Sequence, residues 1–120
     1  MQGTEKQMQW AEELVQKFNQ ELDCIIAMIP EQEKQGAVAG LKDTYNALFE
    51  NAYAGDIIES MKYLDHFHGI DYYERVTIAF RLSGTRLGHQ ITEEICQWTK
   101  LQKQRFGGST ENSKEKGETK

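Results

Sequence analysis

The sequence predicts an all-α bundle of four to five amphipathic helices, with residues 1–106 as a single helical domain and residues 107–120 as a disordered polar tail. Apolar residues recur at steps of three and four along most of residues 1–106, which is the spacing of one helix face. Pro30 is the only proline, so almost no position is barred from a helix. Polar or glycine-containing breaks divide the periodic stretches into units of ordinary helix length.

The first predicted helix spans Thr4 to Ile29 and carries the clearest signal in the chain. Thr4 and Gln7 match a capping box, in which a hydroxyl and an amide satisfy the free N–H groups of the first turn. Pro30 ends the helix, because the residue before a proline is disfavoured in the α conformation. The predicted apolar stripe contains Trp10, Ala11, Leu14, Val15, Phe18, Leu22, Ile25, Ile26 and Ile29.

The second and third predicted helices occupy residues 31–53 and 56–67. Gly36 and Gly40 disfavour the start of the second helix, or allow another helix to approach closely, so we expect firm helix only from about Val38. Gly55 is the expected stop. Asp56 is then the expected N-cap of the third helix, which a glycine at position 69 would end.

A fourth helix is predicted from the capping box formed by Asp71 and Glu74. Residues 76–80 are also compatible with a short strand, but a lone strand would have no pairing partner, so helix is favoured. Ser83 to Thr85 is either a turn or a weak point in one long helix. The last helix is expected to reach about Phe106, and the tail beyond it has no aliphatic or aromatic residue.

The net charge of −5 is unevenly distributed. Residues 1–56 contain ten acidic and four basic residues, whereas residues 57–106 contain six acidic and seven basic ones. The acidic half disfavours general nucleic-acid binding and suits a basic surface on a partner protein. No apolar run is long enough to cross a bilayer, and the N-terminus lacks the layout of a signal peptide, so a cytoplasmic location is expected.

The two cysteines, Cys24 and Cys96, lie among apolar residues and are expected to be small buried side chains. Their number and spacing predict neither a metal site nor a disulfide framework. No catalytic sequence signature is present, and no cofactor is predicted.

A metal-dependent hydrolase is one alternative, because all-α pyrophosphohydrolases bind Mg²⁺ through paired acidic motifs. Such a site would use the acid pairs and histidines of the chain middle: Asp56, Glu59, His66, His68, Asp71 and Glu74. Helix caps explain the acid pairs, and a position at a helix C-terminus explains the histidines. We therefore favour structural roles for these residues.

A DNA-binding regulator is the other alternative. Residues 75–105 suggest a helix-turn-helix, with polar and basic candidate contacts at Arg81, Arg86, His89 and Gln90. The spacing from Ala79 to the glycine of the turn is one residue longer than usual, and a second glycine falls inside the would-be recognition helix. A solvated helix surface explains the same residues.

Residues 3–18, GTEKQMQWAEELVQKF, resemble an N-terminal element of small proteins from phages, plasmids and other mobile elements of Gram-positive bacteria. The shared form is GTEKQ-x-x-WAE, matched here by Gly3, Thr4, Glu5, Lys6, Gln7, Trp10, Ala11 and Glu12. The resemblance covers about an eighth of the chain. It implies a mobile-element origin, where small acidic helical proteins often bind a host or competing protein, as anti-CRISPR inhibitors do.

The leading expectation is a non-catalytic protein that binds another protein, such as a bacterial defence effector, or a second copy of itself. Twelve aromatic residues exceed what one small core readily hides, and one of the adjacent tyrosines at positions 72 and 73 is expected to be exposed. The expected partner-binding residues combine the acidic face of the first helix with this tyrosine pair: Glu12, Glu13, Glu21, Asp23, Tyr72 and Tyr73.

Overall fold

A computed structural model describes residues 1–104, and these form five helices and no strand. The helices are α1 (Glu5–Met28), α2 (Gln32–Glu50), α3 (Ala54–Met61), α4 (Gly69–Leu82) and α5 (Arg86–Gln102). The predicted all-α class is therefore confirmed. The predicted tail, and the end of the last predicted helix at Phe106, lie outside the described residues.

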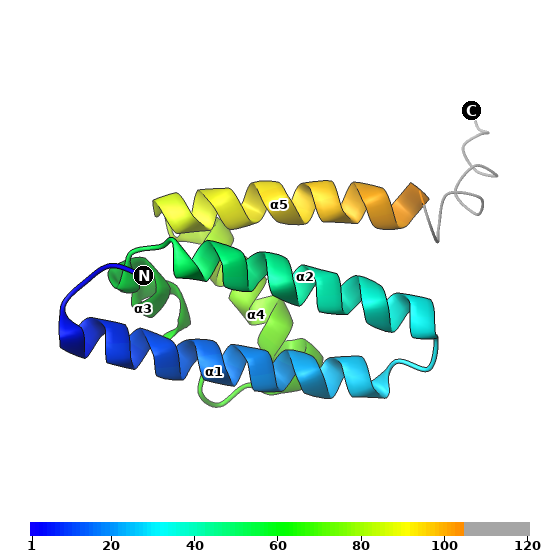
Figure 1. Cartoon of the computed structure of the whole chain (residues 1–120), viewed down its shortest axis with the longest axis horizontal. Helices are drawn as coiled ribbons and strands as arrows, with labels where there is room; N and C mark the ends of the chain where they lie inside the picture. Colours follow the sequence, from blue (N-terminus) through cyan, green and yellow to red (C-terminus); the bar gives the residue numbers. More distant parts are fainter. Residues whose placement is uncertain (105–120) are drawn as a thin grey trace.

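The three longer helices α1, α2 and α5 lie roughly alongside one another, and α4 crosses behind them (Figure 1). The hairpin of α1 and α2 is antiparallel, and α5 packs on the other side of α2. The short helix α3 packs near the start of α1. Helix α1 contacts α2, α3 and α4, which explains why its apolar stripe is wide.

Aromatic rings from three helices form the centre of the core. Phe18 of α1 lies 4.8 Å from Tyr45 and 5.3 Å from Phe49 of α2, measured between ring centroids. Phe80 of α4 lies 6.2 Å from Phe49. All four rings are at most 1% exposed, and such tilted or edge-on pairs stabilise a core beyond their area burial.

The predicted boundaries of α1 are confirmed. The Thr4 hydroxyl accepts a hydrogen bond from the Gln7 N–H, and the Gln7 amide oxygen accepts one from the Thr4 N–H, both at 3.1 Å. Ile29 is extended, as expected before Pro30. The placement of Trp10 in the core was wrong: it lies at the edge of the stripe and is 46% exposed.

Helix α2 starts earlier than predicted. The Gln35 side-chain amide donates hydrogen bonds to the backbone oxygens of Ile26 and Ile29, at 3.2 and 2.7 Å, and so joins the first turns of α2 to the end of α1. This tertiary contact outweighs the low helix propensity of Gly36 and Gly40. Apart from the backbone of α2 itself and the chain neighbours, no atom of residues 1–104 lies within 4 Å of a Cβ built at either glycine, so neither allows a close helix approach.

The expected capping roles of Gly55 and Asp56 were wrong. Helix α2 ends at Glu50, and both residues lie inside α3, whose N-cap position is Tyr53. A backbone hydrogen bond to the N-terminal segment fixes the start of α3, because the Ala54 N–H donates to the Gln2 carbonyl oxygen at 2.6 Å. Helix α3 ends at Met61, and Gly69 begins α4 instead of ending α3.

The break between α4 and α5 is a turn, which decides between the two predicted alternatives. Gly84 has a φ of 72°, a conformation that favours glycine. The Thr85 hydroxyl accepts a hydrogen bond from the Gly88 N–H at 2.9 Å and caps α5. A Cβ at Gly88 would collide with the backbone oxygen of Phe80, so this glycine allows α5 to approach α4 closely.

The expected burial of Cys24 and Cys96 was wrong, because both are exposed. Each lies on the outer side of its helix although its sequence neighbours include core residues.

Candidate functional site

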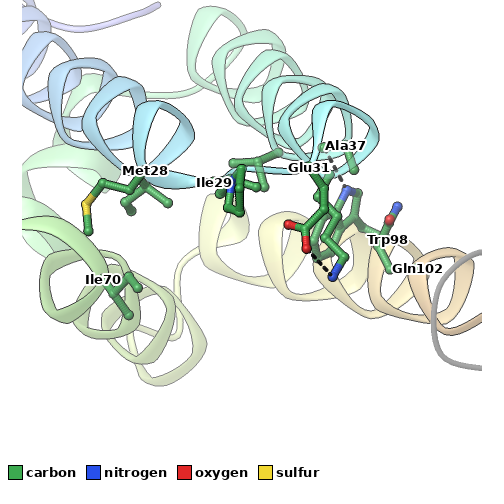
Figure 2. Close-up of a pocket in the computed structure, with 11 residues that line it drawn as sticks. Met28, Ile29, Glu31, Ala37, Ile70, Trp98 and Gln102 are labelled. Atoms are coloured by element: carbon green, nitrogen blue, oxygen red, sulfur yellow. Dashed lines mark hydrogen bonds and ion pairs between the residues drawn. The ribbon is translucent and has the colours of Figure 1, made fainter. Parts of the chain in front are cut away.

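An apolar groove lies where the end of α1, the start of α2, the start of α4 and the last turns of α5 meet (Figure 2). Its volume is about 460 Å³. Its lining is mostly aliphatic and aromatic, and includes Ile25, Met28, Ile29, Val38, Ile70 and Trp98. We call this feature the apolar groove.

Hydrogen bonds fix the walls of the apolar groove. The indole N–H of Trp98 on α5 donates to the backbone oxygen of Ala37 at 3.2 Å, and this bond holds the indole ring against the first turns of α2. Gln35 bonds the carbonyls at the end of α1, as described above, and Pro30 turns the chain between the two helices. These bonds hold the start of α2 to the end of α1 and to α5, and so hold three of the four segments that line the groove.

Two large apolar side chains of the groove face solvent. Met28 is 73% exposed and Ile70 is 60% exposed, and the two come from different helices. In Figure 2, Met28 at the end of α1 lies above Ile70 at the start of α4, and both lie away from Trp98. Exposed apolar side chains that gather around a hollow mark surfaces that bind other molecules.

The polar groups at the apolar groove are few. Glu31 and Lys34 form an ion pair of 3.8 Å at its rim. Within residues 1–104, the side-chain oxygen of Gln102 is enclosed and has no hydrogen-bond partner. A mostly apolar lining with a few polar groups at its edge is typical of a binding pocket.

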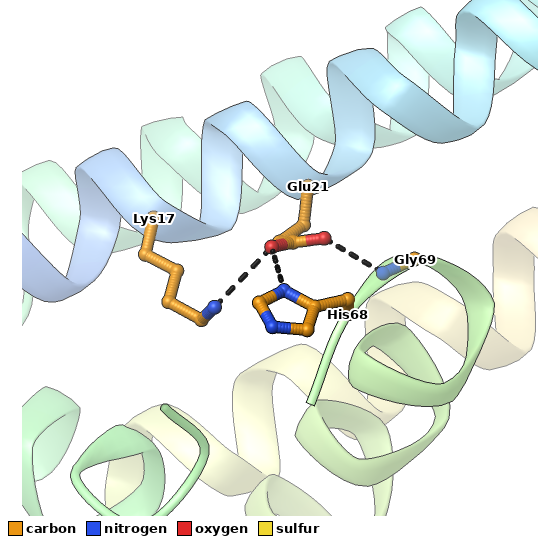
Figure 3. A network of polar contacts seen from close by, with 4 residues as sticks. All are labelled: Lys17, Glu21, His68 and Gly69. Atoms are coloured by element: carbon orange, nitrogen blue, oxygen red, sulfur yellow. Dashed lines mark hydrogen bonds and ion pairs between the residues drawn. The ribbon is translucent and has the colours of Figure 1, made fainter. Parts of the chain in front are cut away.

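A second arrangement of polar groups joins α1 to α4 (Figure 3). One carboxylate oxygen of Glu21 accepts a hydrogen bond from the Gly69 N–H at 2.7 Å. The other lies 2.9 Å from Nδ1 of His68 and 3.2 Å from Nζ of Lys17. Because the side chain of His68, at the N-cap position, makes no capping hydrogen bond, Glu21 acts as the cap of α4 from another helix.

The Glu21 carboxylate is stabilised in its charged form. Burial alone would raise its pKa, but the hydrogen bonds from the Gly69 N–H, His68 and Lys17, together with the charge of Lys17, lower the pKa to about 2. The predicted capping box of Asp71 and Glu74 is not formed, since α4 begins two residues earlier. The expected position of the histidines at a helix C-terminus was also wrong, because His68 precedes α4.

The six residues expected to bind a partner fall into two groups. Glu12 and Glu13 are exposed, and Asp23 is exposed beside Lys42, to which it pairs at 2.7 Å. The other three residues have internal contacts: Glu21 caps α4, Tyr72 is 1% exposed, and the Tyr73 hydroxyl lies 3.5 Å from that of Tyr45.

The expectation that one of the two adjacent tyrosines is exposed was wrong, because Tyr72 is buried and Tyr73 is partly buried. Surplus aromatic residues do reach the surface, but elsewhere. Trp10 is 46% exposed, Tyr53 is 53% exposed and Tyr63 is 72% exposed.

The four residues of the DNA-binding alternative do come together. Arg81, Arg86, His89 and Gln90 line one hollow of about 620 Å³ between the end of α4 and the start of α5. We call this feature the arginine hollow.

The acidic residues and histidines of the hydrolase alternative do not come together in a metal site within residues 1–104. Within residues 1–104, no three His, Cys, Asp or Glu side chains are grouped so that they could hold a metal ion. Asp56 and Glu59 lie on α3, whereas Asp71 and Glu74 lie on α4 and Asp71 pairs with Arg75 at 3.7 Å. The hydrolase alternative therefore gains no support from this geometry.

Sequence reasoning did not identify the apolar groove. It assigned Ile25 and Ile29 to the apolar stripe of the first helix, but did not show that four chain segments leave a gap between them. The available signal was Met28 and Ile70, two large apolar residues of which one falls outside that stripe and the other precedes the predicted start of the fourth helix.

No described helix is both long enough and apolar enough to span a membrane. Comparison with protein-family models found no matching family, and no curated protein or solved structure matches the chain.

Proposed function

We propose that this protein acts by stoichiometric binding to another protein, without catalysis of its own, and that the apolar groove is the contact surface. The observation that carries the proposal is the groove of about 460 Å³ flanked by the exposed side chains of Met28 and Ile70. Water covers these apolar atoms in the free protein, and a partner would release it.

The shape of this surface favours a protein over a small ligand. Met28 and Ile70 line the groove yet are 73% and 60% exposed, so an occupant that covers both must also cover the solvent-facing rim of the groove. A side chain of the partner would enter the groove against Trp98, and its neighbours would cover the exposed rim. Tryptophan anchors and adaptable methionines are typical of such contacts.

The class of partner follows from the resemblance of residues 3–18 to mobile-element proteins. We place the protein among phage or mobile-element inhibitors of bacterial defence systems, with an anti-CRISPR-like mode of action in the cytoplasm. Glu12 and Glu13, which stay exposed beside Trp10 on α1, would add contacts to a basic surface on the same partner.

Affinity capture with matched variants tests this proposal. Met28→Glu places a charge at the apolar groove, and Leu82→Glu makes the same kind of change at a leucine that is 75% exposed and does not line the groove. The tagged wild-type protein and Leu82→Glu should retain the same partner from a lysate of a Gram-positive host, in one-to-one amounts, and Met28→Glu should lose it.

Two results would count against the proposal. One is retention of the same partner by Met28→Glu. The other is the absence of any specific partner together with monomeric behaviour in solution, measured by light scattering. A stable dimer that Met28→Glu dissociates would instead make a second copy of this chain the occupant of the apolar groove.

A further inference from the structure

The arginine hollow is a second surface, independent of the apolar groove. It lies at the junction of α4 and α5, and its lining includes Arg81, Thr85, Arg86, His89 and Gln90. Both arginines are exposed, and neither forms an ion pair or hydrogen bond within residues 1–104.

The lining of the arginine hollow contains two arginines and no aspartate or glutamate, although the net charge of the chain is −5. The nearest acids along α5, Glu93 and Glu94, lie one turn further on. Arg75 already has partners, since it lies 3.7 Å from Asp71 and 4.2 Å from the ring centroid of Phe67. Arg81 and Arg86 are therefore the side chains available to meet an anion.

The surrounding segment has the order helix, turn, helix. Helix α4 is followed by a three-residue turn and by α5, and the close contact at Gly88 fixes the two helices against each other. Arg86, His89 and Gln90 are spaced as one face of α5. His89 is 77% exposed at its side chain and lies 3.6 Å from Glu93, further along the same helix.

We infer that the arginine hollow binds the phosphodiester backbone of duplex DNA. Arginine has a planar group with several donors that matches phosphate oxygens, and unpaired arginines lose no existing ion pair when they bind. With the two arginines on phosphates, only the first turn of α5 would lie against the duplex, where His89 and Gln90 can reach base edges, and Glu93 and Glu94 would lie further from it.

Fluorescence anisotropy with a short labelled DNA duplex tests this inference on the full-length chain. We expect binding at about 50 mM salt that weakens steeply towards about 200 mM, because phosphate contacts release counterions. Arg81→Ala combined with Arg86→Ala should weaken binding at least tenfold, as expected for about two lost phosphate contacts. The control is Lys100→Ala combined with Lys103→Ala, which removes the same charge from the other end of α5.

The control should bind within about twofold of wild type, and thermal melts should show that both double variants fold. Polyglutamate as a competitor separates nucleic acid from an acidic protein surface, and should not displace the duplex at equal charge concentration. The inference is overturned if the wild type does not bind at low salt, if both double variants bind equally, or if polyglutamate competes as well as unlabelled duplex.

Discussion

Glu21 caps a helix that begins 48 residues later in the chain, and its removal should destabilise the fold. Its carboxylate accepts the Gly69 N–H at 2.7 Å and contacts His68 and Lys17 at 2.9 and 3.2 Å. Only 13% of the Glu21 side chain is exposed, so water cannot readily replace these partners. Glu21→Ala would remove all three interactions and leave the Gly69 N–H without its acceptor.

The magnitude follows from these contacts. Hydrogen bonds to a charged group contribute about 1.5–3 kcal/mol, and loss of a helix cap costs about 1 kcal/mol. Since the contacts share one carboxylate and are not additive, we expect Glu21→Ala to lower the free energy of unfolding by about 2–3 kcal/mol. For a domain of this size that is a decrease in Tm of about 10–15 °C.

Circular dichroism melts of matched variants provide the assay. Glu13→Ala is the control, because Glu13 is an exposed glutamate on the same helix and undergoes the same change in helix propensity. The Tm of Glu21→Gln should lie between those of wild type and Glu21→Ala, since an amide oxygen can still accept a hydrogen bond from the Gly69 N–H but carries no charge. If Glu21→Ala melts within about 2 °C of Glu13→Ala, the capping role assigned to Glu21 is incorrect.

Three further predictions concern stability. The pKa of Glu21 is lowered from 4.5 to about 2 in the folded state, so the contribution of its charge to folding stability is complete above about pH 4.5 and is lost as the pH falls towards 2. The difference in free energy of unfolding between wild type and Glu21→Gln, measured with urea, should therefore shrink across that interval. Gly88→Ala should destabilise the fold, because the added Cβ would collide with the backbone oxygen of Phe80. Gly36→Ala, with open space around the added Cβ, should stabilise the fold by about 1 kcal/mol. If chemical denaturation ranks the two variants in the opposite order, the close helix contact at Gly88 is refuted. Thr4→Ala should cost about 1 kcal/mol and increase amide exchange in the first turn of α1, and unchanged exchange there would contradict the capping box.

The helix content of this chain was predictable where local signals agreed. In α1, the spacing of apolar residues, the capping pair of Thr4 and Gln7, and Pro30 all indicate the same boundaries, and the structure has them. The fold class follows from that agreement, because successive stripes of this kind must pack on one another.

The start of α4 was not predictable, because its cap comes from a distant residue. The pair Asp71 and Glu74 satisfies the local pattern of a capping box, yet α4 begins at Gly69 under the carboxylate of Glu21. The start of α2 was misplaced for a similar reason, since Gln35 bonds to the end of α1. The capping pattern read along the chain does not show a hydrogen bond that comes from another helix.

The candidate surfaces differ in how far the sequence indicated them. The arginine hollow joins residues close together in the chain, so the turn and the helical spacing of Arg86, His89 and Gln90 were sufficient to suggest it. The apolar groove joins four segments, from Ile25 to Gln102, and depends on how the helices cross. A stripe of apolar residues does not show which of its members the bundle leaves uncovered.

Site-specific photocrosslinking in a Gram-positive host tests most directly whether the apolar groove meets a partner protein. A benzophenone amino acid would replace Met28 at the groove in one strain, and Leu82 away from it in another. Both positions are similarly exposed, so the label itself is equally accessible in the two strains. We predict a single adduct, with the mass of one partner added to one chain, from position 28 and not from position 82. An adduct from position 82 alone, or no adduct from either position, would contradict the proposed binding surface.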